Sequence, residues 1–325
     1  MEFVKNIFWN TGESRLRTTY RILIQFILFI VIRNLTEFVI QHFTHQNALT
    51  ANAPSWYLLL LGFARLFPAL VSVWLIGRFI DRRSFKDFGF DFNAAWWRDF
   101  AFGLGLGGLS MAAIFLIEYS CGWIKISSMY YLINKQAPFI IPISGCLILF
   151  ICAGIAEELV FRGYQIKNLA EGFNLKFIGA KHAVIMALVF SSTLFRIFHF
   201  ENPGATVVST LNIITGGILL GIGYILTKQL AISIGLHISW NFFQGNVFGF
   251  PVSGITFPSE TASIVKINQA GPVLWTGGSF GPEAGLLGLI IILTGIVLIT
   301  VWVKMTNKNV TINSALISFS RNERE

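Results

Sequence analysis

Two adjacent glutamates, Glu157 and Glu158, lie in an otherwise apolar run that extends from Ile143 to Arg162. A charged side chain at the centre of a bilayer costs about 2.5–3.5 kcal/mol, so such residues usually have a function or a partner. Arg162 follows Glu158 by four residues, the favourable order for an ion pair on one helix face. Glu157 projects about 100° away around the helix. We therefore expect Arg162 to neutralise Glu158, which leaves Glu157 to act as a general base.

Two further polar motifs follow along the chain. His199 closes the fifth apolar run, and His237 lies four residues before Asn241 in the seventh. Four-residue spacing places His237 and Asn241 on one helix face, where both can donate to a single oxygen. A carboxylate, a histidine and two donors are the groups that activate water and stabilise a tetrahedral oxyanion. Together the three motifs predict a hydrolytic site within the membrane.

Other polar or reactive side chains in the apolar runs have simpler explanations. Three arginines are expected to be structural or to extend towards the headgroups: Arg33, Arg65 and Arg196. The three cysteines form no Cys-x-x-Cys pair, so we expect neither a disulfide framework nor a redox site.

The composition indicates the elements that must position these residues. The chain has 325 residues, of which 54% are hydrophobic and only 12% charged. Soluble domains carry about 25% charged residues, so we expect an all-α polytopic integral membrane protein. About eight runs are long enough to cross as transmembrane helices, since crossing requires about 20 residues. They cover residues 20–43, 55–80, 99–120, 139–163, 180–199, 205–227, 229–248 and 283–304.

These runs form one membrane domain over residues 20–304, because no long polar stretch separates them. Residues 1–19 are predicted to be a cytoplasmic or interfacial segment, and residues 305–325 a cytoplasmic tail. The Gly-rich stretch 250–282 is expected on the outer side as a re-entrant segment, a lid or an ordered loop.

Basic residues support this arrangement of spans. Most Lys and Arg residues fall on alternate connections, and only Lys125, Lys135 and Lys266 fall on the others. The bias predicts a multi-pass protein of the cell membrane with both termini in the cytoplasm. It also explains the net charge of +8 by topology and contact with anionic membrane lipid. Nucleic acid is therefore not an expected partner.

Small residues at four-residue spacing predict where helices approach closely. They are Gly103 with Gly107, Gly217 with Gly221, Gly281 with Gly285, and the series Ala231, Gly235 and Ser239.

The ordered trio Glu-Glu-x-x-x-Arg, Phe-x-x-x-His and His-x-x-x-Asn resembles the CPBP family, the CAAX-protease and bacteriocin-processing membrane proteins also called the Abi family. The three motifs are complete at Glu157–Arg162, Phe195–His199 and His237–Asn241. The resemblance covers a protease-like core at about residues 80–245. Two further stretches, Phe248–Gly254 and Gly277–Gly285, look like a bacterial branch of the family.

This resemblance implies an intramembrane endopeptidase that cleaves a peptide or a membrane protein. Glu157 and His199 would activate water, His237 and Asn241 would hold the oxyanion, and Glu158 with Arg162 would support them. The favoured account needs no cofactor. The family was long described as metal-dependent, so a zinc site formed by Glu157, His199 and His237 stays open as an alternative.

The residues also leave other classes to consider. His-Glu-x-x-His and Gly-x-Ser-Gly are absent, and all aspartates fall between residues 81 and 99, which excludes three other kinds of intramembrane protease. A non-catalytic membrane immunity or scaffold protein stays possible. A transporter is disfavoured because no pair of broken helices recurs in two halves. The substrate, any role of prenylation and the oligomeric state are not readable from the residues.

If every predicted run crosses the membrane as a straight helix, two residues of the predicted site lie near opposite faces of the membrane. These spans place Glu157 near the inner face and His199 near the outer end of its helix. We therefore expect the fifth span to be tilted or short, or Glu201–Pro203 to enter the bilayer beside protein or a water-filled cavity.

Overall fold

Long apolar helices make up most of the chain in the computed structural model, which describes residues 7–44, 54–134, 137–199, 202–256, 261–307 and 310–317. The main helices are α2 (Thr18–Thr44), α3 (Ser55–Ile76), α4 (Ala94–Ser120), α5 (Ile140–Glu157), α7 (Ala180–Ile197), α8 (Val207–Thr227), the shorter α9 (Ala231–Phe242) and α12 (Leu286–Asn307). Two short helices are α6 (Lys167–Phe173) and α11 (Val273–Thr276). Two antiparallel pairs join β1 (Trp9–Asn10) to β2 (Arg15–Leu16) and β3 (Ile124–Leu132) to β4 (Ala262–Gln269).

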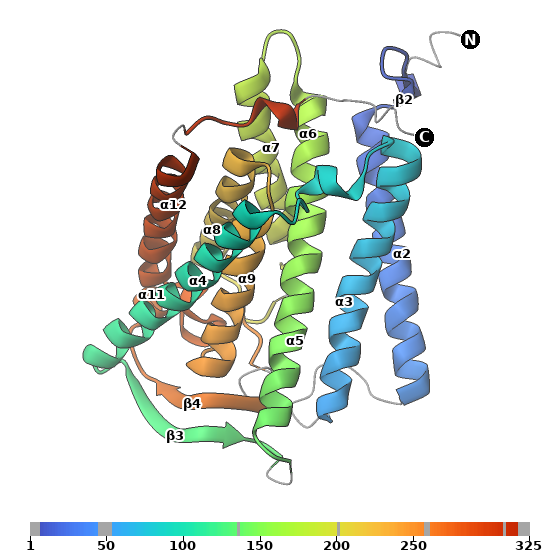
Figure 1. The fold of residues 1–325 in the computed structure, drawn as a ribbon. Helices are drawn as coiled ribbons and strands as arrows, with labels where there is room; N and C mark the ends of the chain where they lie inside the picture. The colour runs from blue at the N-terminus through green and yellow to red at the C-terminus, as the bar shows by residue number, and fades with distance from the viewer. Residues whose placement is uncertain are drawn as a thin grey trace.

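Within these described ranges, seven helices are long and apolar enough to cross a membrane, which confirms the predicted all-α polytopic class. The eighth predicted span, 229–248, corresponds to α9 and the π-helical turn η4 (Phe243–Val247) that continues it. Residues Ala231–Trp240 are all buried, because α4, α5 and α8 pack around α9. Figure 1 shows α9 inside the bundle. The expected eighth crossing helix is therefore a short central helix that is largely enclosed by protein.

The helix that carries the two glutamates changes geometry at that point. Helix α5 ends at Glu157, and a π-helical segment, η3 (Glu158–Ile166), continues it into α6. Every residue of η3 is buried. Wide π turns inside α-helices commonly occur at functional sites, because they change the direction in which side chains project. Here the change falls between Glu157 and Glu158.

Small residues let α4 and α9 approach each other closely. A Cβ atom at Gly103 would lie 2.4 Å from the carbonyl oxygen of Ile232, and one at Gly235 would lie 2.4 Å from that of Phe100. The predicted small-residue contact is thus present between α4 and α9.

The third predicted pair, Gly281 and Gly285, does not join helices. Gly281 has φ +103°, and a Cβ there would lie 2.2 Å from the carbonyl oxygen of Pro251. A Cβ at Gly285 would lie 2.1 Å from the carbonyl oxygen of Trp275. These two glycines instead let turns of the 250–285 region pack closely. The described part of that region is ordered and includes β4, which pairs with β3 at the end of the bundle opposite α6 (Figure 1).

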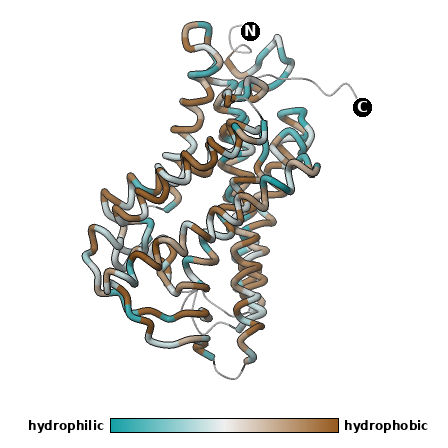
Figure 2. Tube along the Cα trace, turned by 60° about the vertical axis from the view of Figure 1, so that its left-hand side comes forward, coloured by the Kyte–Doolittle hydropathy of each residue, from teal (hydrophilic) through white to brown (hydrophobic). Residues whose placement is uncertain are grey.

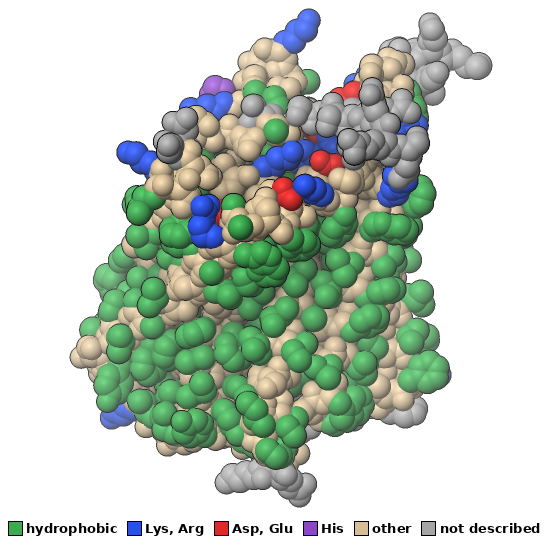
Figure 3. All heavy atoms as spheres, viewed as in Figure 1, with side chains coloured by type: hydrophobic (Ala, Val, Ile, Leu, Met, Phe, Trp, Pro, Cys, Tyr) green, Lys and Arg blue, Asp and Glu red, His purple; other side chains and the backbone are tan. Residues whose placement is uncertain are grey.

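Charge separates the two ends of the bundle. Figure 2 shows hydrophobic residues along the long helices and hydrophilic ones concentrated at the end where the termini lie. On the face seen in Figure 3, hydrophobic side chains cover a broad band, and Lys and Arg gather above it. The protein is therefore membrane-embedded, and its N-terminal, 77–93 and 167–179 segments lie at one end (Figure 1).

Some of these basic residues are buried, although they were expected only to flank the spans. Glu171 of α6 pairs with Arg15, Arg21 and Arg83, and Arg21 also donates to Asp81 at 2.7 Å. All five side chains are almost inaccessible, with exposed fractions of 6% or less. This charged cluster joins β2 and α2 to the connection after α3 and to α6.

Candidate active site

A cavity of about 380 Å³ opens among α5, α7, α8 and α9, with α2 and α3 on one side. Its lining includes all four residues predicted to act on a substrate: Glu157, His199, His237 and Asn241. Glu157 comes from the end of α5, His199 from the turn after α7, and the other two from α9. Glu158 and Arg162 lie behind this wall and are fully buried.

Glu158 holds two partners through one oxygen. Arg162 Nη1 donates to Glu158 Oε1 at 2.9 Å, the ion pair that the four-residue spacing predicts. Nδ1 of His237 lies 2.7 Å from the same oxygen. A carboxylate only accepts, so Nδ1 carries a proton and the ring orientation is set. Glu158 therefore orients His237, a contact that the sequence motifs do not reveal.

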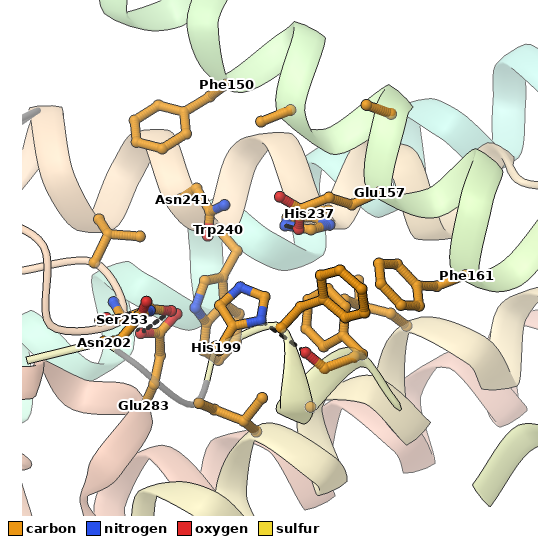
Figure 4. A pocket seen from close by; sticks show the side chains of 18 of the residues that line it. Phe150, Glu157, Phe161, His199, Asn202, His237, Trp240, Asn241, Ser253 and Glu283 are labelled. Carbon is orange, nitrogen blue, oxygen red and sulfur yellow. Dashed lines mark hydrogen bonds and ion pairs between the residues drawn. The ribbon is translucent and has the colours of Figure 1, made fainter. Parts of the chain in front are cut away.

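Glu157 faces the cavity between two cationic or ionisable neighbours. Its Oε2 lies 3.6 Å from His237 Nε2, and its Oε1 lies 3.7 Å from Arg65 Nη1. Both distances exceed those of direct hydrogen bonds, so these neighbours act on the carboxylate mainly by charge. The side chain is 23% exposed, and this exposure is towards the cavity (Figure 4). Glu157 can therefore meet a substrate, whereas Glu158 cannot.

His199 reaches the cavity because α7 stops before it. The helix ends at Ile197, and His199 N–H donates to Arg196 O at 2.9 Å in the following turn. His199 Nδ1 donates to Phe195 O at 2.8 Å, since a carbonyl oxygen can only accept. Burial lowers the pKa of His199, which favours the neutral ring. In that tautomer Nε2 is the acceptor and can take a proton.

Glu157 and His199 line the same cavity, and α7 ends at Ile197, two residues before the predicted end of the fifth span. The turn after α7 also contributes Asn202 to the cavity lining. Glu201, part of the same prediction, lies outside the described residues.

Several residues of the cavity were not predicted to belong to a site. Arg65 was assigned a structural role, yet it lies beside Glu157. Arg33 also lines the cavity and pairs with Glu37 at 2.9 Å. Arg65 and Arg33 each lie inside an apolar run of the sequence, and this position could have indicated that they belong to the site. Asn202, Ser253 and Glu283 form a second polar group in the lining. Only the family-like stretches around Ser253 and Glu283 pointed to that group.

In the part of the chain that the structure describes, no three His, Cys, Asp or Glu side chains are arranged to hold a metal ion. In the proposed zinc set, His237 Nδ1 already contacts Glu158, and Nε2 points towards Glu157. A histidine whose Nδ1–H bonds a carboxylate can still ligate a metal through Nε2, so the zinc alternative is a hypothesis for direct metal analysis.

Comparison with known proteins identifies this same segment. Residues 139–243 match the family model described as "Type II CAAX prenyl endopeptidase Rce1-like". The match contains all three motifs and confirms the predicted resemblance to a CAAX-protease family over these residues. The chain is also 29% identical over 178 residues to "Uncharacterized protein YyaK" of Bacillus subtilis (strain 168). That alignment covers 54% of this chain and 56% of the relative, about half the length of each.

Proposed function

We propose, from the match of residues 139–243 to the Rce1-like type II CAAX prenyl endopeptidases, that this chain is an intramembrane endopeptidase. The observation that carries the proposal is the single cavity lined by Glu157, His199, His237 and Asn241. Its substrate is a peptide or a membrane protein that reaches the cavity from the bilayer.

In the proposed reaction, Glu157 removes a proton from water while His199 Nε2 orients that water by accepting its second hydrogen. The resulting hydroxide attacks the carbonyl carbon of the scissile peptide bond. The negative charge moves to the carbonyl oxygen, where Asn241 Nδ2 and the protonated Nε2 of His237 donate to it. The carboxylates of Glu157 and Glu158 favour that protonated ring, because they lie 3.6 and 2.7 Å from its two nitrogens.

Collapse of the tetrahedral intermediate breaks the carbon–nitrogen bond. Glu157 then returns its proton to the departing amine, which regenerates the Glu157 carboxylate. One water molecule is consumed for each peptide bond that is broken. No other reactant is needed for this balance. Arg162 pairs with Glu158, and Glu158 in turn holds the His237 ring in place.

The direct test is comparative peptidomics of cells that carry either the wild-type protein or Glu157→Gln, with His199→Ala as a second variant. Peptides produced by the wild type should be absent from both variants, while membrane insertion stays normal. Glu37→Gln, which changes a carboxylate outside the cavity lining, is the control and should keep the products. If both site variants yield the wild-type peptides, the chain acts as a scaffold or immunity protein.

The zinc alternative is tested on purified protein. We expect substoichiometric zinc by elemental analysis and unchanged hydrolysis after chelation and dialysis. Stoichiometric zinc whose removal stops cleavage, and whose return restores it, would contradict the metal-free reaction.

A further inference from the structure

A second polar wall of the cavity takes no part in the proposed hydrolysis. It is formed by Asn202 in the turn after α7, Ser253 in the loop after η4 and Glu283 in the 3₁₀ turn η6 (Pro282–Ala284). Figure 4 shows this Glu283 cluster on the other side of His199 from Glu157. The cavity lining thus holds two acidic residues, Glu157 and Glu283, on separate walls.

Hydrogen bonds hold the Glu283 carboxyl in one orientation. The backbone N–H of Ser253 donates to Glu283 Oε2 at 2.6 Å, and the Ser253 hydroxyl donates to the same oxygen at 2.9 Å. Asn202 Nδ2 donates to the Ser253 carbonyl at 2.7 Å, which fixes the turn from its other side. Ser253 has φ +49°, a conformation that must be held by such contacts. The carboxyl is therefore pre-oriented at the cavity wall.

Among the described residues Glu283 has no cationic partner, unlike Glu157 on the other wall of the cavity. Glu158 pairs with Arg162, Glu171 pairs with three arginines, and Glu157 has Arg65 within 4 Å. Within the described residues, the hydrogen-bond partners of Glu283 are Ser253 and Gln244, which are both neutral. His237 acts on it only weakly and is bonded to Glu158 instead. Burial accordingly raises the pKa of Glu283.

We propose that Glu283, oriented by Ser253, forms a subsite that binds a protonated amine or guanidinium of the peptide substrate. The inference rests on the proposed function and names the substrate class: an apolar peptide with a cationic group near the bond to be cleaved. A Lys or Arg side chain or a free N-terminal ammonium supplies this chemistry. A bound cation would provide the missing counter-charge, so the desolvation cost of Glu283 would favour cationic ligands over neutral ones of the same shape.

The alternative role is a purely structural one, in which Glu283 only pins the loop through Ser253. Glu283→Gln separates the two roles, because the amide oxygen still accepts from Ser253 but carries no charge. A structural role predicts equal effects on all peptides. A cation subsite predicts an effect that depends on peptide charge.

The experiment uses full-length Glu157→Gln protein in lipid nanodiscs, in which Glu283 is the remaining acid of the lining and turnover is suppressed. Fluorescent apolar peptides carry Lys, Arg, norleucine or Glu at each position in turn, and each is made with a free and an acetylated N-terminus. We expect Lys or Arg at one position, or the free terminus, to lower Kd about tenfold relative to its neutral counterpart. Adding Glu283→Gln should reduce that ratio to about 1.

The proposal would be overturned if neither a cationic residue at any position nor the free N-terminus lowered Kd. It would also be overturned if Glu283→Gln left the ratio of the two Kd values unchanged. The first outcome needs no Glu283 variant, so it decides even if that variant fails to fold. Cleavage by the wild-type protein is scored separately. If no peptide is cleaved but the Kd ratio depends on Glu283, the proposed hydrolysis fails and the cation subsite stands.

Discussion

At the residue scale, the two adjacent glutamates lie in different environments, because the helix changes from α to π geometry between them. Glu158 is fully buried and shares one oxygen between Arg162 and His237. Glu157 lies at the cavity, with His237 and Arg65 beyond hydrogen-bonding distance. The sequence spacing predicted the Glu158–Arg162 pair, since that contact is local to one helix. It could not predict the His237 contact, which depends on how α9 packs against α5.

The two carboxylates should therefore respond differently to the same change. Glu157→Gln should preserve thermal stability and reduce hydrolysis at least about 100-fold, the usual contribution of a general base. Glu158→Gln should lower the free energy of unfolding by about 3–5 kcal/mol, because Arg162 loses its buried counter-charge. Thermal unfolding and peptide hydrolysis, measured on both variants in the same detergent, check the difference. Equal stability losses in the two variants would contradict the assigned roles.

At the scale of elements, the contact between α4 and α9 positions half of the site. The glycines of this contact were recognisable in the sequence because four-residue spacing places them on one helix face. Gly281 and Gly285 show the same spacing but belong to turns, where close backbone approach at both positions and a positive φ at Gly281 require glycine. Spacing alone cannot separate these cases, since it does not reveal whether the intervening residues are helical.

Substitutions in α4 test this contact. Gly103→Ala places a Cβ 2.4 Å from Ile232 O, so α9 must move, and overpacking should cost about 1–3 kcal/mol. The shift should also displace His237 and reduce hydrolysis. Gly105→Ala is the matched control, because a Cβ there meets no atom within 4 Å. It should keep activity and gain about 0.5–1 kcal/mol from the better helix propensity of alanine. Unfolding and activity measurements on both variants check the contact, and similar results for the two would contradict it.

At the scale of the whole molecule, hydropathy identified the membrane class and all seven long helices. It assigned a span to residues 229–248, where α9 and η4 form a shorter helix, because a helix enclosed by other helices is as apolar as one that faces lipid. It also missed that Arg15 and Arg21 are buried. Their partners Asp81 and Glu171 lie far along the chain, so only the assembled fold brings them together. Glu283 reaches the cavity for the same reason.

The charged cluster should be a main determinant of stability. Glu171→Gln leaves the positive charges of Arg15, Arg21 and Arg83 without their shared acid and should cost about 3–5 kcal/mol. Glu37→Gln removes an exposed ion pair with Arg33 and should cost about 1 kcal/mol or less. Thermal unfolding of the two variants in one lipid mixture checks the contrast. A small effect of Glu171→Gln would show that the cluster is not a stabilising link.

Helix α2 is buried in the protein near its start and less so further along, so the surrounding lipid can act on its later part. Its buried residues, Arg21 and Gln25, both lie towards its first turns, whereas Phe29 and Arg33 further along line the cavity. The part of α2 that lines the cavity thus lies beyond the two buried residues of this helix. Acyl chains of different length would tilt that part by hydrophobic mismatch. The rate of hydrolysis should therefore change with bilayer thickness even where the melting temperature does not, so that the membrane itself would regulate how peptides reach Glu157.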